Sequence, residues 1–119
     1  MEGPPDITVI IPTRGGERSL KPTLRALERQ TLPFSRFEVI IVDNSPRGKL
    51  LKQIDDSATN SDLNIKCLRE PIPGKSRAMM RGIQEIQGKY IAATEDDCLP
   101  QKNWLETALH GFQKEADNV

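Results

Sequence analysis

The sequence is poor in the residues that define several classes of protein. Its 119 residues include two cysteines, one histidine and 4% aromatic residues. Cys67 and Cys98 form no CxxC pair, and the opening MEGPPD lacks the basic and apolar regions of a signal peptide. We therefore expect reduced thiols in a cytoplasmic protein. The single His110 falls in a predicted helix, and the acids beside Cys98 disfavour its thiolate, which argues against a Cys–His nucleophile.

Long apolar runs and an excess of charge are also missing. No apolar run approaches the roughly 20 residues that a membrane-spanning helix needs. Lysine plus arginine equals aspartate plus glutamate at 17 each, so the net charge is zero. This balance gives no reason to expect a nucleic acid or an anionic membrane as a partner. The length and composition are typical of one soluble domain with a modest core.

Short apolar runs alternate with segments of helical periodicity. The runs, each typical of a β-strand, cover residues 7–11, 37–43, 65–70 and 89–94, and the third is expected near a sheet edge. Pro12 is predicted to end the first strand. The helical segments cover residues 19–30, 46–56, 74–87 and 101–113, with Ser19 and Ser45 as N-caps of the first two. In the last segment the residues predicted to face inward are Trp104, Leu105, Ala108 and Phe112.

This alternation predicts an α/β fold, namely a Rossmann-like parallel sheet of about four strands with helices on both faces. We expect a tail at residues 1–6, one subdomain at 7–113 and a second tail at 114–119. In parallel sheets, ligands bind at the carboxyl ends of the strands, where the strand order reverses. The polar residues that follow each apolar run are therefore the candidates for a binding site.

Three consecutive acids follow the fourth run, in YIAATEDDCLP. Glu95, Asp96 and Asp97 repel one another unless water, a proton or a cation offsets their charge. Their oxygens suit Mg²⁺ or Mn²⁺, and in extended chain residues 95 and 97 point to one side. The structural alternative is a favourable interaction with the next helix dipole. Capping fits poorly, because Leu99 would be the cap if Pro100 is the first helical residue.

Basic residues open the third predicted helix, in PGKSRAMMRGI. This stretch is not a P-loop, because that motif requires a glycine at position 69, where the chain has Arg69. Lys75, Arg77 and the helix N-terminus can still attract phosphate. A solvated basic helix start accounts for the same residues equally well.

Two further positions stand at the ends of apolar runs. Asp43 can shape a turn, but Ser45 is predicted to cap the next helix, which leaves Asp43 available to a ligand. Thr13 and Arg14 fit either a ligand contact or an ordinary surface loop.

The chain resembles the N-terminal, nucleotide-sugar-binding half of inverting glycosyltransferases of family 2, which have the GT-A fold. The resemblance runs from about residue 7 to about residue 112. It rests on three segments in order, TVIIPTRGGERSLKPTLRALERQTLPFSRFEVIIVDNS, PGKSRAMMRGI and GKYIAATEDDCLPQKNWLE. The combination is more specific than any one of them.

The resemblance implies contacts to a nucleotide-sugar donor, with a UDP-sugar expected. Pro12 and Thr13 match the segment that wraps the base, and Asp43 matches the acid that hydrogen-bonds it. Lys75 and Gly82 match a segment that often reads Gly-Lys-x-x-Ala-Leu-Asn-x-Gly.

The acids match the acid-x-acid motif of this family. Asp97 would hold Mn²⁺ or Mg²⁺ on the diphosphate, and Glu95 and Asp96 would contact the ribose or the metal shell. Trp104 and Leu105 match a packing position. The chain departs from the pattern at Met79 and Met80, where the family often has arginine or asparagine, and at Glu95, which replaces the commoner aspartate.

A complete enzyme of this kind has a second half, which binds a carbohydrate or lipid-linked acceptor and supplies the base that activates its hydroxyl. The implied reaction is an in-line displacement at the anomeric carbon, with the metal stabilising the departing diphosphate. The chain ends before any such element. We therefore expect a donor-binding fragment that is inactive alone, with an apolar edge that favours self-association.

Two other classes remain open. A receiver domain has a similar size, but it carries an acidic pair after its first strand, where this chain has PTRGG. A non-catalytic α/β interaction module would keep the fold without binding nucleotide.

Overall fold

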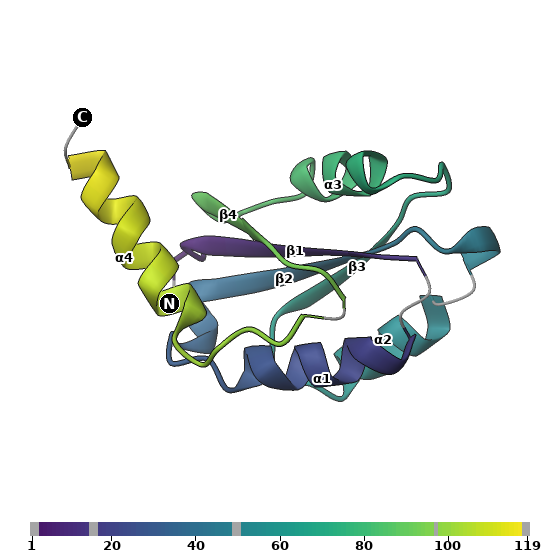
Figure 1. Ribbon diagram of the computed structural model, residues 1–119, viewed down its shortest axis with the longest axis horizontal. Helices are drawn as coiled ribbons and strands as arrows, with labels where there is room; N and C mark the ends of the chain where they lie inside the picture. Colours follow the sequence, from purple (N-terminus) through teal and green to yellow (C-terminus); the bar gives the residue numbers. More distant parts are fainter. Residues whose placement is uncertain (1–2, 15–16, 49–50, 97, 118–119) are drawn as a thin grey trace.

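Four parallel strands form a sheet in the order β3-β2-β1-β4, which confirms the predicted Rossmann-like α/β fold (Figure 1). The computed structural model describes residues 3–14, 17–48, 51–96 and 98–117. The strands are β1 (Ile7–Thr13), β2 (Phe37–Asp43), β3 (Ile65–Arg69) and β4 (Tyr90–Ala93).

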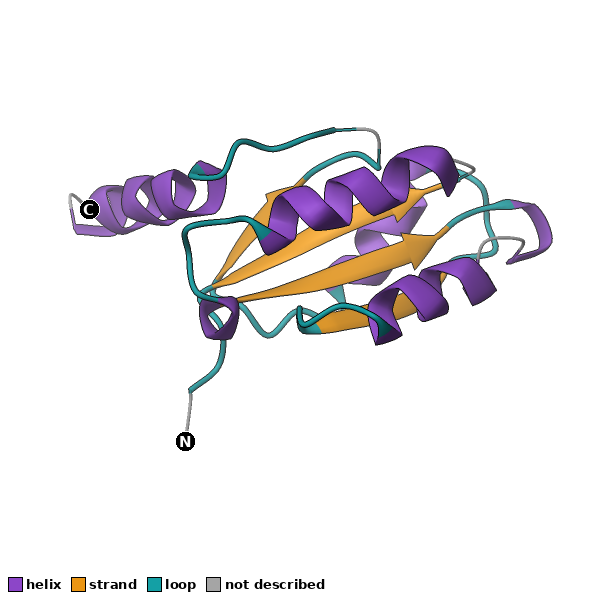
Figure 2. Ribbon diagram, turned by 90° about the horizontal axis from the view of Figure 1, so that it is seen from below, coloured by secondary structure: helices purple, strands orange, loops and turns teal. Residues whose placement is uncertain are grey.

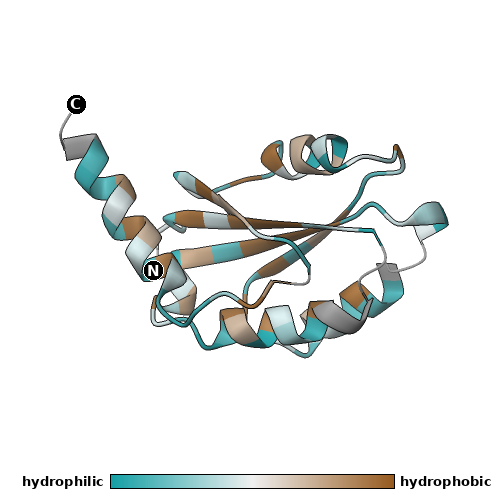
Figure 3. Ribbon diagram, viewed as in Figure 1, coloured by the Kyte–Doolittle hydropathy of each residue, from teal (hydrophilic) through white to brown (hydrophobic). Residues whose placement is uncertain are grey.

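The two central strands are buried almost throughout because their side chains are apolar on both faces. Their register runs from Ile7 opposite Phe37 to Thr13 opposite Asp43. Figure 3 shows this concentration of apolar residues along β1. β3 is half-exposed along its length and lies at one edge, as the sequence predicts.

Pro12 does not end the first strand, which continues to Thr13. Hydrogen bonds along β1 alternate in direction, since Ile10 accepts from Thr94 on the β4 side and Thr13 accepts from Asn44 on the β2 side. The nitrogen of Pro12 therefore points toward the β4 side. Pairing with β4 ends at Ile10, so the missing N–H interrupts no ladder bond.

Helices cover both faces of the sheet (Figure 2). On one face lie α1 (Glu17–Glu28) and α2 (Leu51–Thr59), and on the other lies α3 (Lys75–Ile83). Short 3-10 turns, η1 (Phe34–Arg36) and η2 (Pro46–Gly48), precede β2 and α2. Among the helices in the described ranges, none is long and apolar enough to cross a membrane.

The core is much larger on the face of α1 and α2 than on the face of α3. The smaller core contains Ile10, Ile40, Val42 and Ala78. A Cβ at Gly82 would lie 2.9 Å from a methyl carbon of Ile10, so glycine allows α3 to approach β1 closely.

The last helix, α4 (Trp104–Asp117), begins later than predicted and continues into the segment expected as a tail. Leu105 and Leu109 are buried, and Phe112 stacks on Tyr90 of β4 with ring centroids 4.7 Å apart. After β4 the chain returns beside α1. Gln30, just beyond the end of α1, accepts from Leu105 N through Oε1 and donates to Gln101 O through Nε2. This return places α4 at the amino end of the sheet (Figure 1).

The predicted starts of the first two helices are wrong. α1 begins at Glu17, before Ser19, because the apolar pattern marks the buried face of a helix rather than its ends. α2 begins at Leu51 instead of Pro46, and η2 stands in between. Arg47 has φ of 58°, a left-handed conformation that interrupts a helix at that point.

Candidate functional site

Strand order reverses between β1 and β4, and this reversal defines the candidate site. The chain proceeds from β1 to β2 and β3 on one side, whereas β4 joins β1 on the other. Thr13 and Asp43 end β1 and β2, and residues 95–97, which we call the acid segment, follow the end of β4 in the sequence. These groups therefore meet at the edge where open α/β sheets bind ligands.

Asp43 is fully buried at this edge. Its Oδ1 accepts hydrogen bonds from Ser45 N (2.8 Å) and Ser45 Oγ (2.5 Å). The Arg69 guanidinium lies 3.8 Å from the same oxygen. Within the part of the chain that the structure describes, Asp43 Oδ2 has no hydrogen-bond partner. A buried carboxylate oxygen without a donor is costly, which marks Asp43 as a candidate ligand contact.

Ser45 therefore has a different role from the one predicted. It lies six residues before Leu51, the first residue of α2, and donates to Asp43, both through its backbone N–H and through its hydroxyl. The aspartate shapes this turn through Oδ1, and its buried Oδ2 accepts no hydrogen bond from the described residues. From the sequence alone, the turn role and the ligand role of Asp43 are alternatives. The two carboxylate oxygens allow one side chain to serve both.

The acid segment is tied to β1 and α1. Thr13 Oγ1 donates to Asp96 Oδ2 over 2.6 Å. Thr23 Oγ1 lies 2.8 Å from Asp96 O and 2.7 Å from Cys98 O. Asp96 thus faces β1. Asp97, the predicted metal ligand, lies outside the described residues.

Glu95 is paired with Lys75 of α3. Lys75 Nζ lies 2.6 Å from Glu95 Oε1, and both side chains are more than half exposed. The hydrogen bond and positive charge of Lys75 lower the pKa of the Glu95 carboxyl below its ordinary value. Across residues 3–14, 17–48, 51–96 and 98–117, no group of three histidine, cysteine, aspartate or glutamate side chains could hold a metal. Two carboxylates of the triplet therefore stand at the edge, one of them already neutralised by a lysine.

A hollow of about 690 Å³ lies beside this ion pair. Its walls come from β1, α3, the end of β4 and the segment that leads to α4, through Pro12, Lys75, Met79, Thr94, Glu95 and Trp104. Arg77 and Arg14 are exposed. The structure thus places Pro12, Lys75 and Glu95 around one hollow, with Thr13 and Asp96 bonded to each other next to it.

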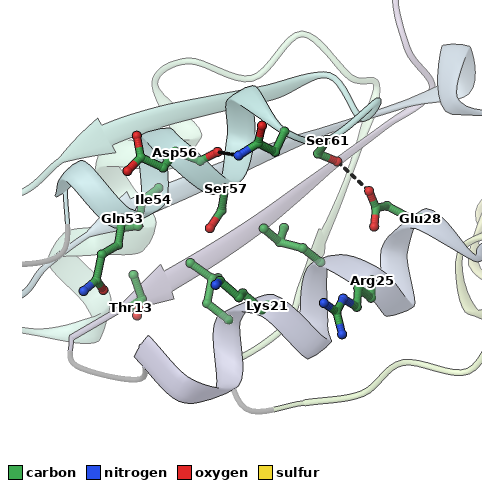
Figure 4. A pocket seen from close by; sticks show the side chains of 12 residues that line it. Thr13, Lys21, Arg25, Glu28, Gln53, Ile54, Asp56, Ser57 and Ser61 are labelled. Atoms are coloured by element: carbon green, nitrogen blue, oxygen red, sulfur yellow. Dashed lines mark hydrogen bonds between the residues drawn. The ribbon is translucent and has the colours of Figure 1, made fainter.

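A second hollow, of about 640 Å³, lies between α1 and α2 (Figure 4). Lys21 and Arg25 line it from α1, and Gln53 and Ser57 line it from α2. Thr13 stands at its end, and Ser61 Oγ bonds Glu28 Oε2 over 2.9 Å across the gap.

Two polar residues of the site are missed by sequence reasoning. Asn44 is buried and bonds the segment before α3, and Thr23 is fully buried and bonds the acid segment. The only local signal for Asn44 is its place directly after Asp43. Nothing local distinguishes Thr23 from other threonines on a helix.

Proteins with glycosyltransferase names match this chain over most of its length. Glycosyltransferase AglE of Haloferax volcanii is 30% identical over 108 residues, which are 88% of this chain and 34% of AglE. The crystal structure of S. aureus TarS 1-349 in complex with UDP-GlcNAc matches with a TM-score of 0.75 at 27% identity, over 92% of this chain and 31% of that one. The mannosyltransferase PcManGT of Pyrobaculum calidifontis, in complex with GDP-Man and Mn²⁺, matches with a TM-score of 0.74 at 25% identity, over 92% and 32%.

The chain therefore spans about a third of the length of these relatives. The family model described as glycosyl transferase family 2 matches residues 8–119, which is nearly the whole chain. The protein belongs to family 2 of the glycosyltransferases and has the GT-A fold.

Proposed function

We propose that this chain binds a nucleotide-sugar donor, a UDP-sugar, together with a divalent cation, and that it serves glycosyl transfer in the complete protein. The observation that carries the proposal is the buried, unpaired Oδ2 of Asp43 at the reversal of strand order. Family membership supports it, as do similar structures in complex with UDP and UDP-GlcNAc.

Asp43 is proposed to accept a hydrogen bond from the base. Uracil presents one ring N–H, which matches a single free carboxylate oxygen. Guanine also has a ring N–H, so this contact alone does not separate UDP from GDP. Pro12 and Thr13 would border the base on the β1 side.

Lys75 and Arg77, both in the first turn of α3, are proposed to face the diphosphate together with the N-terminus of that helix. Backbone N–H groups and the helix dipole favour an anion at this position. The hollow of about 690 Å³ has Lys75 on its wall and has room for a sugar diphosphate.

The acid segment fits a divalent cation because its oxygens are hard ligands, and Mn²⁺ or Mg²⁺ is proposed. Asp97 and Glu95 would hold it, with Asp96 facing the ribose. When bound, the cation would offset the negative charge of the departing diphosphate. To bind the cation, Glu95 would give up its bond to Lys75. The ammonium group of Lys75 could then turn toward the phosphates.

The acceptor, a carbohydrate or a lipid-linked carbohydrate, and the base that activates it are proposed to belong to other parts of the complete protein. On its own the chain would bind the donor without transferring the sugar. A non-catalytic interaction module is the rival function, and it predicts no nucleotide binding.

The test is calorimetric titration of UDP, GDP and uridine, with and without Mn²⁺. Wild type is compared with Asp97→Ala and Asp43→Asn, and Asp62→Ala serves as control because Asp62 is an exposed acid in the loop before β3, at the other end of the sheet. We expect UDP binding that Mn²⁺ strengthens. Asp97→Ala should remove the effect of Mn²⁺ on UDP affinity. Asp43→Asn should lower the affinities for UDP and uridine to a similar extent, and Asp62→Ala should change neither affinity. Failure of folded wild type to bind any of the three ligands would contradict the proposal.

A further inference from the structure

Asn44 connects the two sides of the proposed donor site. It follows Asp43 at the end of β2 and is 3% exposed. Its side-chain nitrogen donates to Glu70 O and Ile72 O, both over 2.8 Å. Its side-chain oxygen accepts from Gly74 N over 3.0 Å. All three bonds reach the segment between β3 and α3.

This segment ends where α3 begins. Gly74 is the residue before Lys75, the first residue of the helix. Gly74 has φ of 134°, which side chains other than that of glycine rarely tolerate, and no side chain caps the helix at this point. Asn44 is therefore the side chain that fixes the backbone immediately before Lys75.

We propose that Asn44 is a positioning residue of the donor site, which sets the distance between Asp43 and Lys75. This inference rests on the proposed function, since it assigns the base to Asp43 and the diphosphate to Lys75. A nucleoside diphosphate spans both contacts, whereas a nucleoside reaches only the first. Substitution of Asn44 should then lower the affinity for UDP, which has the phosphates, more than the affinity for uridine, which lacks them.

Only an amide side chain meets all three requirements at this position. It offers two donors to the carbonyls and one acceptor to the Gly74 N–H from a single planar group. Aspartate has the same shape, but it would place a carboxylate oxygen against two carbonyl oxygens. Alanine removes all three bonds and leaves Asp43 in place.

The experiment uses Asn44→Ala, Asn44→Asp and Gly74→Ala, with Asn60→Ala as the matched control. Asn60 also donates its side-chain amide to a backbone carbonyl, that of Asp56, but it is exposed and directly follows the last residue of α2. Hydrogen exchange of the amides of residues 70–75 is measured without ligand. Affinities for uridine and UDP are then measured for each folded variant.

In both Asn44 variants we expect faster exchange of the Gly74 amide, with β2 unchanged. We expect UDP affinity to fall roughly 10-fold, the size of about one lost hydrogen bond, and uridine affinity to stay within about 2-fold. Gly74→Ala should give the same pattern, and combining it with Asn44→Ala should add little, because the two residues share one bond. Asn60→Ala should behave as wild type.

Three outcomes would overturn the inference. Unchanged exchange at Gly74 would mean that Asn44 does not hold the segment. Equal loss of uridine and UDP would mean a general structural role. Additive effects of the Asn44 and Gly74 substitutions would mean that they act separately. Failure of wild type to bind either ligand would instead reject the proposed function, and the inference with it. If Asn44→Ala does not fold, Asn44→Asp, alone and combined with Gly74→Ala, decides between these outcomes, because it disrupts the same bonds to Glu70 O and Ile72 O.

Discussion

Glu38 and Asp43 lie on the same strand. Both are fully buried, and each has one carboxylate oxygen that accepts no hydrogen bond from the described residues. Glu38 lies near the amino end of β2. Its Oε2 accepts from Thr8 Oγ1 (2.6 Å) and from Gln87 N (2.7 Å), and Lys66 Nζ lies 3.7 Å from its Oε1. Asp43 closes the carboxyl end of the strand, where its Oδ1 accepts from Ser45 in the turn that follows and lies 3.8 Å from the Arg69 guanidinium.

The comparison shows that an unpaired buried oxygen does not identify a site by itself. Glu38 joins three strands and the segment after α3, far from the reversal of strand order, which indicates a structural role. Asp43 has the same signature at the edge where ligands bind. Position in the fold therefore separates the two carboxylates, and each of the following predictions tests that separation.

The largest effect is expected for Glu38→Ala. It would leave the Thr8 hydroxyl and the Gln87 N–H without their acceptor, and we expect the free energy of unfolding to fall by about 3 kcal/mol. UDP affinity should not change. Urea denaturation measures the first quantity and calorimetry the second.

The control for this prediction is Glu85→Ala. Glu85 forms an exposed ion pair with Arg81, and we expect its loss to cost about 0.5 kcal/mol. A Glu38→Ala protein that lost UDP binding while remaining folded would remove the distinction between the two carboxylates.

The second effect is on binding, for Asp43→Asn. The amide would either turn its NH₂ toward the base N–H or lose its bonds to Ser45, so UDP affinity should fall about 30-fold, equivalent to about 2 kcal/mol. Glu38→Gln is the matched control on the same strand and should leave the affinity unchanged. Equal affinities of Asp43→Asn and wild type would mean that the free oxygen of Asp43 does not meet the ligand.

A smaller effect is expected for Gly48→Ala, because Gly48 lies close to Arg69, whose guanidinium lies beside Asp43. Gly48 has φ of 67°, and an added Cβ would lie 3.1 Å from Arg69 Nε. We expect a cost of about 1 kcal/mol in thermal denaturation, together with weaker UDP binding. Gly111→Ala on α4 meets no atom within 4 Å and should be neutral or slightly stabilising. No loss of stability in Gly48→Ala would show that this turn relaxes freely.

The smallest effect concerns Glu95, an exposed carboxylate whose cationic partner, Lys75 Nζ, lies at hydrogen-bond distance from it. Lys75 lowers the Glu95 pKa, so the charged pair forms above the ordinary Glu pKa and is lost as pH falls through the lowered value. Lys75→Met should raise the Glu95 pKa toward the ordinary value, which carboxyl-carbon NMR can measure. Lys114→Met, in the last turn of α4, should leave it unchanged, and the same titration midpoint in all three proteins would contradict the pairing.

The sequence was sufficient for the fold class, for the positions of the four strands and for Asp43 at a strand end. Continuous apolar runs in a short α/β chain restrict the sheet strongly, and strand ends then follow from the same runs. Edge placement of β3 was also predictable, because its run is weaker and carries Lys66 and Arg69.

Contacts between distant segments could not be predicted. Glu38 sits inside an apolar run, and its burial becomes intelligible only once Thr8 and Gln87, 30 and 49 residues away, are placed beside it. Asn44 likewise bonds residues 26 to 30 positions further on. The start of α2 was wrong for a local reason, because a serine before a proline resembles a helix cap, whereas Ser45 serves Asp43.

The strand order also has a consequence for folding. β1 pairs on one edge with β2, its neighbour in the chain, and on the other edge with β4. The bond between Thr13 and Asp96 joins residues 83 positions apart. Closing so long a loop is entropically costly and slow. We therefore expect the crevice to be the last part of the sheet to assemble and the first to open locally. A nucleotide that contacts both β1 and the segment after β4 would stabilise the pairing of these two parts. Donor binding and completion of the sheet would then be one coupled equilibrium.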